Sequence, residues 1–96
     1  MSTAQEIVDA ITEHVGNDKY SNWYAGIAAD PEDRLFGYHE VDRKNGKWIY
    51  DSATSNASAR SAEDALHRAG FKGGPGGGDS KTKGVYAYKI TSATVE

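Results

Sequence analysis

The sequence contains no cysteine and no long hydrophobic run. The lack of cysteine excludes disulfide bonds, thiolate metal ligands and thiol nucleophiles together. No apolar stretch approaches the roughly 18 residues that a membrane-spanning helix needs. The first residues are neither basic nor apolar, so no signal peptide is predicted. We therefore expect a cytoplasmic protein without contact to a membrane.

A surplus of positive charge is also missing, since the formal net charge is −3. Proteins that bind nucleic acids usually present a basic face, because neutralising phosphates supplies much of their affinity. Lysine and arginine gather only locally, within 43–47, 60–72 and 81–89. The composition therefore argues against strong unspecific DNA binding but agrees with a local basic patch.

The chain length fits one small domain, and 38% hydrophobic residues suffice for a modest core. Hydrophobic periodicity, capping residues and helix-ending glycines predict three helices, over 4–15, 30–39 and 57–69. Thr3 and Glu6 form a capping box before the first helix, and Asp30 caps the second. We expect a single domain over 1–96, with the amino-terminal helix in 1–16.

Three segments rich in aromatic and β-branched residues are predicted to be strands, over 23–28, 47–53 and 84–91. In the last of them, alternation separates two faces, with Val85, Ala87 and Lys89 on one and Tyr86, Tyr88 and Ile90 on the other. The expected fold is an α/β (α+β) domain with a small, three-stranded, mainly antiparallel sheet and three helices.

A glycine-rich run, Gly73-Gly74-Pro75-Gly76-Gly77-Gly78, lies within a predicted loop over 70–83. A loop that cradles phosphate lies between a strand and a helix, so that backbone amides and the helix start meet the anion. Here the run follows a helix and precedes a strand. We interpret it as a connector, the most mobile internal segment because glycine backbone is costly to order. A nucleotide-binding loop is the weaker alternative.

The three histidines are too scattered for a zinc site, since His14 and His67 lie on predicted helices without a histidine at i+4. Both are predicted to be surface residues. No serine stands in a nucleophile-elbow context, so serine-type acyl transfer has little support. A zinc site and serine-type catalysis are therefore not expected.

The most informative segment joins the first predicted strand to the short second helix. Tyr24 and Gly26 form a Tyr-x-Gly strand motif, and Arg34 follows eight residues after the glycine. One helical turn later stand Tyr38 and His39. This arrangement resembles the GIY-YIG nuclease family, whose second strand carries Tyr-x-Gly and whose next helix carries Arg and then His or Tyr.

The family also reads Gly-Ile-Tyr shortly before that motif, and no such tripeptide precedes Trp23. Instead, Gly84-Val85-Tyr86 opens the last predicted strand. If that strand lies beside the first, the domain is a circular permutation of the family layout, and the resemblance covers about residues 23–92. We predict that the two strands pair directly, with Tyr86 and Tyr24 within side-chain reach.

The resemblance implies a metal-dependent, nuclease-like domain that hydrolyses DNA phosphodiesters. Tyr86 or Tyr24 would assist the attacking water, and Arg34 would hold the phosphate through two hydrogen bonds. Glu63, on the alanine-rich helix, matches the family's metal-binding glutamate and would anchor one Mg²⁺. The implied site residues are Tyr24, Arg34, Tyr38, His39 and Tyr86 for catalysis, Glu63 for the metal, and Gly26 and Gly84 for the shape of the site.

Plainer roles are open for the same residues. Tyrosines of a small sheet often serve packing, Arg34 can pair with the acids around its own helix start, and Glu63 can favour a helix start. A non-catalytic binding or inhibitor protein on the same scaffold is therefore the alternative, with a protein partner in place of DNA. The net negative charge favours that alternative.

Overall fold

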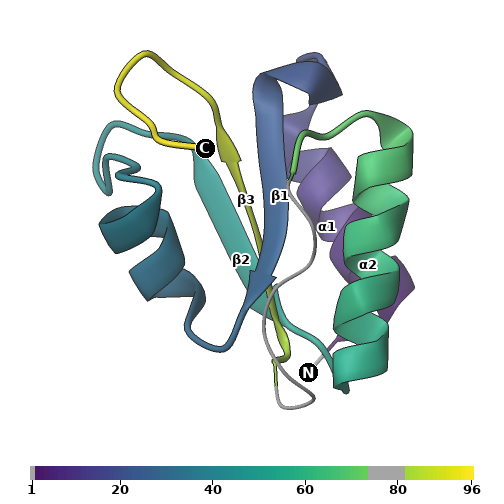
Figure 1. Cartoon of the computed structure of the whole chain (residues 1–96). Helices are drawn as coiled ribbons and strands as arrows, with labels where there is room; N and C mark the ends of the chain where they lie inside the picture. Colours follow the sequence, from purple (N-terminus) through teal and green to yellow (C-terminus); the bar gives the residue numbers. More distant parts are fainter. Residues whose placement is uncertain (1, 74–81) are drawn as a thin grey trace.

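The computed structural model describes residues 2–73 and 82–96. Over these residues, three helices and a 3₁₀ turn surround a three-stranded antiparallel sheet (Figure 1), and the predicted fold class is confirmed. Within the described ranges, no helix is long and apolar enough to cross a membrane. In chain order, the elements are α1 (Ala4–Val15), the 3₁₀ turn η1 (Tyr20–Asn22), β1 (Trp23–Ala28), the π-helix η2 (Asp33–Tyr38), β2 (Trp48–Ser52), α2 (Asn56–Ala69) and β3 (Gly84–Lys89).

The strand β3 lies in the centre of the sheet, which has the order β1-β3-β2. It pairs antiparallel with both neighbours, so Tyr86 stands opposite Gly26 of β1 and Tyr50 of β2. The predicted direct pairing of the last strand with the first is therefore confirmed. The rings of Tyr24 and Tyr86 have their centroids 6.4 Å apart, so these side chains are within reach of each other, as predicted.

The two faces of the sheet carry different layers. Figure 1 shows α1 and α2 together on one face and η2 on the other. Val85 and Ala87 join the core formed with α1 and α2, whereas Tyr86 and Tyr88 join the smaller core formed with η2. The alternation predicted for β3 is confirmed, because successive residues of a strand point to opposite faces.

The face of α1 that meets the sheet is apolar at helical spacing. Ile7 and Ile11 are fully buried there, and burying a side chain of this size contributes about 1.5–3 kcal/mol. The helix begins with the predicted capping box, since the Glu6 amide donates to the Thr3 hydroxyl at 3.2 Å and the Thr3 amide donates to the Glu6 carboxylate at 2.9 Å. It ends at Gly16, whose φ of 66° favours glycine.

The helix predicted over 30–39 winds differently from an α-helix. Its main part, η2, is a π-helix, and the His39 amide donates to the Arg34 carbonyl, five residues back, at 2.8 Å. A π turn holds one residue more than an α turn. The wider turn rotates His39 inward and leaves Tyr38 outside, with 1% and 56% of their surfaces exposed.

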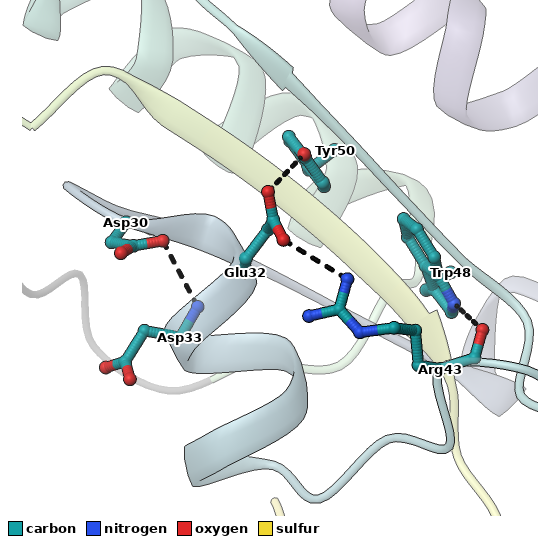
Figure 2. A network of polar contacts seen from close by, with 6 residues as sticks. All are labelled: Asp30, Glu32, Asp33, Arg43, Trp48 and Tyr50. Atoms are coloured by element: carbon teal, nitrogen blue, oxygen red, sulfur yellow. Dashed lines mark hydrogen bonds and ion pairs between the residues drawn. The ribbon is translucent and has the colours of Figure 1, made fainter.

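A polar network fastens the region of η2 to β2 (Figure 2). Asp30 caps the helix start as predicted, because its carboxylate accepts from the Asp33 amide at 3.2 Å. Glu32 accepts from the Tyr50 hydroxyl at 2.9 Å and pairs with Arg43 at 3.2 Å. This ion pair is exposed, so solvent screening leaves it little effect on stability. The network therefore serves mainly to fix where η2 lies over the sheet.

The segments around the predicted glycine-rich loop are hydrogen bonded. They follow α2, which begins at Asn56, just before its predicted start. Residues 74–81 lie outside the described residues, so the predicted mobility of the loop over 70–83 is not tested there. Before them, Lys72 pairs with the edge of β1, its amide donating to the Trp23 carbonyl and its carbonyl accepting from the Ala25 amide, both at 2.8 Å. One wall of the cleft described below is thereby attached to β1.

Candidate active site

A cleft of about 750 Å³ lies where β1, β3, η2 and α2 meet. The fold brings into it residues from four separate elements. The sequence predicts eight site residues, and all but Gly84 line this cleft. These seven are Tyr24, Gly26, Arg34, Tyr38, His39, Glu63 and Tyr86.

The phenol ring of Tyr86 lies across Gly26 of the neighbouring strand. A Cβ atom at residue 26 would stand 2.7 Å from the Tyr86 hydroxyl oxygen and 2.9 Å from the ring carbon that carries it. Only glycine leaves this space, so the Tyr-x-Gly motif of β1 determines where the Tyr86 hydroxyl lies. Tyr24 stacks beside Tyr86, with an angle of 16° between the ring planes.

Gly84 opens β3 opposite Ala28 and does not line the cleft. A Cβ atom there would collide with Pro31 and stand 2.6 Å from the Ala28 carbonyl oxygen. The missing side chain therefore lets the turn that leads into η2 pack against the start of β3. Gly84 shapes the fold next to the site without forming its wall.

Tyr86 and His39 form a buried, hydrogen-bonded pair. The Tyr86 hydroxyl lies 2.8 Å from His39 Nε2, and His39 Nδ1 lies 2.6 Å from the Val95 carbonyl oxygen. A carbonyl can only accept, so Nδ1 carries the proton, and Nε2 of the neutral ring accepts from Tyr86. Burial lowers the pKa of His39 and raises the pKa of Tyr86. Near neutral pH, the imidazole is therefore neutral and the phenol keeps its proton.

Arg34 is exposed at the cleft, and its guanidinium makes no hydrogen bond or ion pair with any residue that the structure describes. Its guanidinium carbon lies 5.0 Å from the centre of the Tyr38 ring, which is a cation–π contact. The nearby acid Glu32 pairs with Arg43 instead. The alternative in which Arg34 merely pairs with acids around its own helix start is therefore wrong for the described residues.

Glu63 lines the cleft from α2 and is only 6% exposed, yet its side chain forms no hydrogen bond or ion pair within the described part of the chain. Burial raises the pKa of its carboxyl. The residue stands well inside α2, which begins at Asn56, so the alternative role at a helix start is wrong. Among the described residues, no fully buried side-chain oxygen lacks a partner, so the Glu63 carboxylate opens onto the cleft, where a cation would supply a counter-charge to its ionised form.

The donor set of the cleft fits one hard cation held by few protein ligands. Among the residues that the structure describes, no three His, Asp or Glu side chains come together as a metal-binding group. Mg²⁺ commonly binds through one or two carboxylates and keeps several waters. Glu63, with water and substrate oxygens as the other ligands, matches that mode of binding.

His67 is a cleft residue that the sequence predicts at the surface, and this prediction is wrong. Its ring is half-buried, and its Nε2 donates to the Ala25 carbonyl of β1 at 2.9 Å. Gly73 passes so close to the ring that any side chain at this position would collide with it. The signal that could have revealed His67 is its spacing, since it follows Glu63 by one turn on the same helix face.

The sequence was compared with protein-family models and curated proteins, and the structure with solved structures, and no match was found. The chemistry of the cleft therefore has to be argued from its own residues. Their geometry combines an unpaired guanidinium, a largely buried carboxylate and a tyrosine–histidine pair.

Proposed function

We propose that this protein hydrolyses phosphodiester bonds of DNA with the help of a divalent cation, and that this cation is Mg²⁺. One observation carries the proposal: Arg34, Glu63 and the Tyr86–His39 pair converge on a single cleft. Phosphodiester hydrolysis needs positive charge at the phosphate, an acceptor for the proton of the attacking water and a metal ligand. Each of these groups can supply one of those requirements.

The Tyr86–His39 pair supports removal of a proton from the attacking water. As the Tyr86 oxygen accepts a proton from water, its own proton moves to His39 Nε2. One O–H bond of the water and the old O–H bond of Tyr86 break, while a new O–H bond on Tyr86 and an N–H bond on His39 form. The resulting imidazolium keeps the bond from Nδ1 to the Val95 carbonyl. Because burial lowers the pKa of His39, the neutral, accepting form of the ring is in place near neutral pH.

Arg34 supports binding of the phosphate. A guanidinium can donate two parallel hydrogen bonds to two phosphate oxygens, and no described residue competes for the donors of Arg34. The Tyr38 ring supports one face of the group at 5.0 Å. A preorganised charge of this kind typically lowers a barrier by about 3 kcal/mol, roughly a hundredfold in rate.

Glu63 would hold the cation on the opposite wall of the cleft, which α2 forms. When bound, Mg²⁺ would neutralise charge that develops on the phosphate and on the leaving oxygen. Lys72 lines the same cleft as Arg34. These two cations share the cleft with the carboxylates of Glu63 and Glu96, so the positive charge available to a phosphate is that of individual side chains in a chain of net charge −3.

The direct test uses wild-type protein with supercoiled, linear and branched DNA, in Mg²⁺, in Mn²⁺ and with a chelator. Metal-dependent cleavage that requires Arg34 and Glu63 supports the proposal. No cleavage of any substrate would favour the alternative, a non-catalytic binding or inhibitor protein with a protein partner. Cleavage that survives both Arg34→Ala and Glu63→Gln would place the active site elsewhere.

A further inference from the structure

After β3, residues 91–96, which we call the strap, fold back over the sheet towards η2 (Figure 1). A turn begins this return, since the Thr94 amide donates to the Thr91 carbonyl at 3.3 Å and the Thr91 amide donates to the Thr94 hydroxyl at 3.0 Å. Val95 then makes two bonds to His39. Its amide donates to the backbone carbonyl of His39 at 2.8 Å, and its own carbonyl accepts from Nδ1 at 2.6 Å.

The strap determines which nitrogen of His39 carries the proton. The Tyr88 hydroxyl also lies near Nδ1, at 3.0 Å, but a hydroxyl can donate or accept and does not select a tautomer. Among the described groups that lie near a ring nitrogen of His39, only the Val95 carbonyl can accept a hydrogen bond but not donate one. Four tyrosine rings pack around the imidazole and fix its orientation. Their centroids lie 4.7 Å (Tyr24), 4.9 Å (Tyr38), 4.9 Å (Tyr88) and 5.5 Å (Tyr86) from the centroid of the His39 ring.

We propose that Val95 is a positioning residue whose backbone, held by the turn of the strap, keeps His39 in the tautomer that accepts the Tyr86 proton at Nε2. This inference deepens the proposed hydrolysis and rests on it. In the other tautomer, Nε2 would donate to the Tyr86 oxygen, and Tyr86 could not pass its proton to the ring. The pair would stay hydrogen bonded but would no longer take a proton from water.

The charges around His39 determine what loss of the strap would do to its titration. Burial lowers the pKa of His39 most, Arg34 lowers it further, and the bond to Val95 and the charge of Glu96 raise it. Among the described residues, the other titratable groups whose rings contact His39 are the four tyrosines named above. Because burial has the largest effect, exposing the ring should move its pKa up towards the ordinary value of 6.5.

The experiment compares wild-type protein with a variant that stops after Ala93 and therefore lacks Val95. NMR of the histidine ring nitrogens reports which nitrogen carries the proton and how the ring titrates, independently of activity. His39 should carry its proton on Nδ1 in the wild type, and should show both tautomers and a higher pKa in the shortened chain. The matched control is Glu96→Gln, which removes a nearby charge, leaves both Val95 bonds in place and should keep the proton on Nδ1.

Val95→Pro is a second variant that keeps the full length, in case the shortened chain loses its fold. It removes the amide that bonds the His39 carbonyl, so the strap should loosen and the second tautomer should appear in a smaller proportion. In DNA cleavage, both variants should lower kcat in proportion to the fraction of His39 that loses the Nδ1 proton, less in Val95→Pro than in the shortened chain, with little change in KM.

Two results would overturn the inference: a wild-type His39 with its proton on Nε2, or an unchanged tautomer in both folded variants. Failure of the proposed function would look different. If the tautomers change as expected and wild-type protein cleaves no DNA, the hydrolysis is wrong, whereas the role of Val95 in placing the His39 proton stands.

Discussion

The hydroxyl of Tyr86 lies over Gly26, the one residue of β1 without a side chain. Gly26→Ala should therefore push the Tyr86 ring aside and separate it from His39. Overpacking of this kind costs about 1–3 kcal/mol, so we expect a lower urea midpoint and a loss of DNA cleavage. The control is Gly37→Ala, where a Cβ atom would come no closer than 3.4 Å to the Asp33 carboxylate and neither property should fall. An unchanged midpoint for Gly26→Ala would show that the ring has room to move.

Arg34→Ala should lower the rate of cleavage roughly a hundredfold or more and leave stability almost unchanged. The guanidinium has no ion pair among the described residues, and surface changes of this kind stay within about 0.5 kcal/mol. The control is Arg43→Ala, which removes the ion pair with Glu32 and a contact over the Phe36 ring. That variant should lose stability and keep its activity. The reverse pattern would show that Arg34 is structural.

Glu63→Gln should abolish cleavage and make the protein more stable near neutral pH. Burial raises the pKa of the Glu63 carboxyl, so folding favours the protonated form and loses stability as the pH rises above the ordinary value of 4.5. The gain should therefore disappear in acid, where both proteins are uncharged at this position. Urea unfolding at neutral and acidic pH measures the difference, and Asp64→Asn, an exposed neighbour on α2, is the control.

Metal binding can be measured without activity. Mg²⁺ or Mn²⁺ should raise the Tm of the wild-type protein, because a ligand that binds only the folded state stabilises it. The same ions should leave the Tm of Glu63→Gln unchanged. An equal rise in both proteins would mean that the cation binds away from Glu63.

Acid should destabilise the protein through His39. Because burial lowers the pKa of this residue, the unfolded chain takes up a proton at a pH where the folded chain does not. The free energy of unfolding should therefore fall as the pH drops below the ordinary value of 6.5. In His39→Gln this fall should be smaller than in the wild type. Equal slopes in the two proteins would contradict the buried, neutral state of His39.

The strand side of the cleft is predictable from sequence because it depends on short-range patterns. Alternation along a strand decides that Tyr86 and Tyr88 share one face, and the pairing of β3 with β1 then brings Tyr86 to Gly26. The spacing from the strand to a capped helix likewise predicts that Arg34 stands near Tyr24. Both lie in the same cleft.

The remaining parts of the cleft depend on contacts that no local pattern encodes. The π turn that buries His39 is stabilised by packing of η2 on the sheet, so residue spacing alone leaves Tyr38 and His39 equally plausible. Val95 acts through its backbone, which carries no residue-specific signal. His67 is a helix residue like many others until β1 presents the Ala25 carbonyl to it.

The central place of β3 has a consequence for how the protein folds as it is synthesised. Of the described strands, β3 is made last, and β1 and β2 each bond to β3 and not to each other. When the growing chain has emerged as far as α2, it contains β1 and β2, but the strand that pairs with both of them has not yet been made. Assembly has to wait for residues 84–89, and pairing between distant segments is slower than local pairing. We expect the sheet to form in one late step, once residues 84–89 have been made, with the edges of β1 and β2 that face β3 unpaired until then.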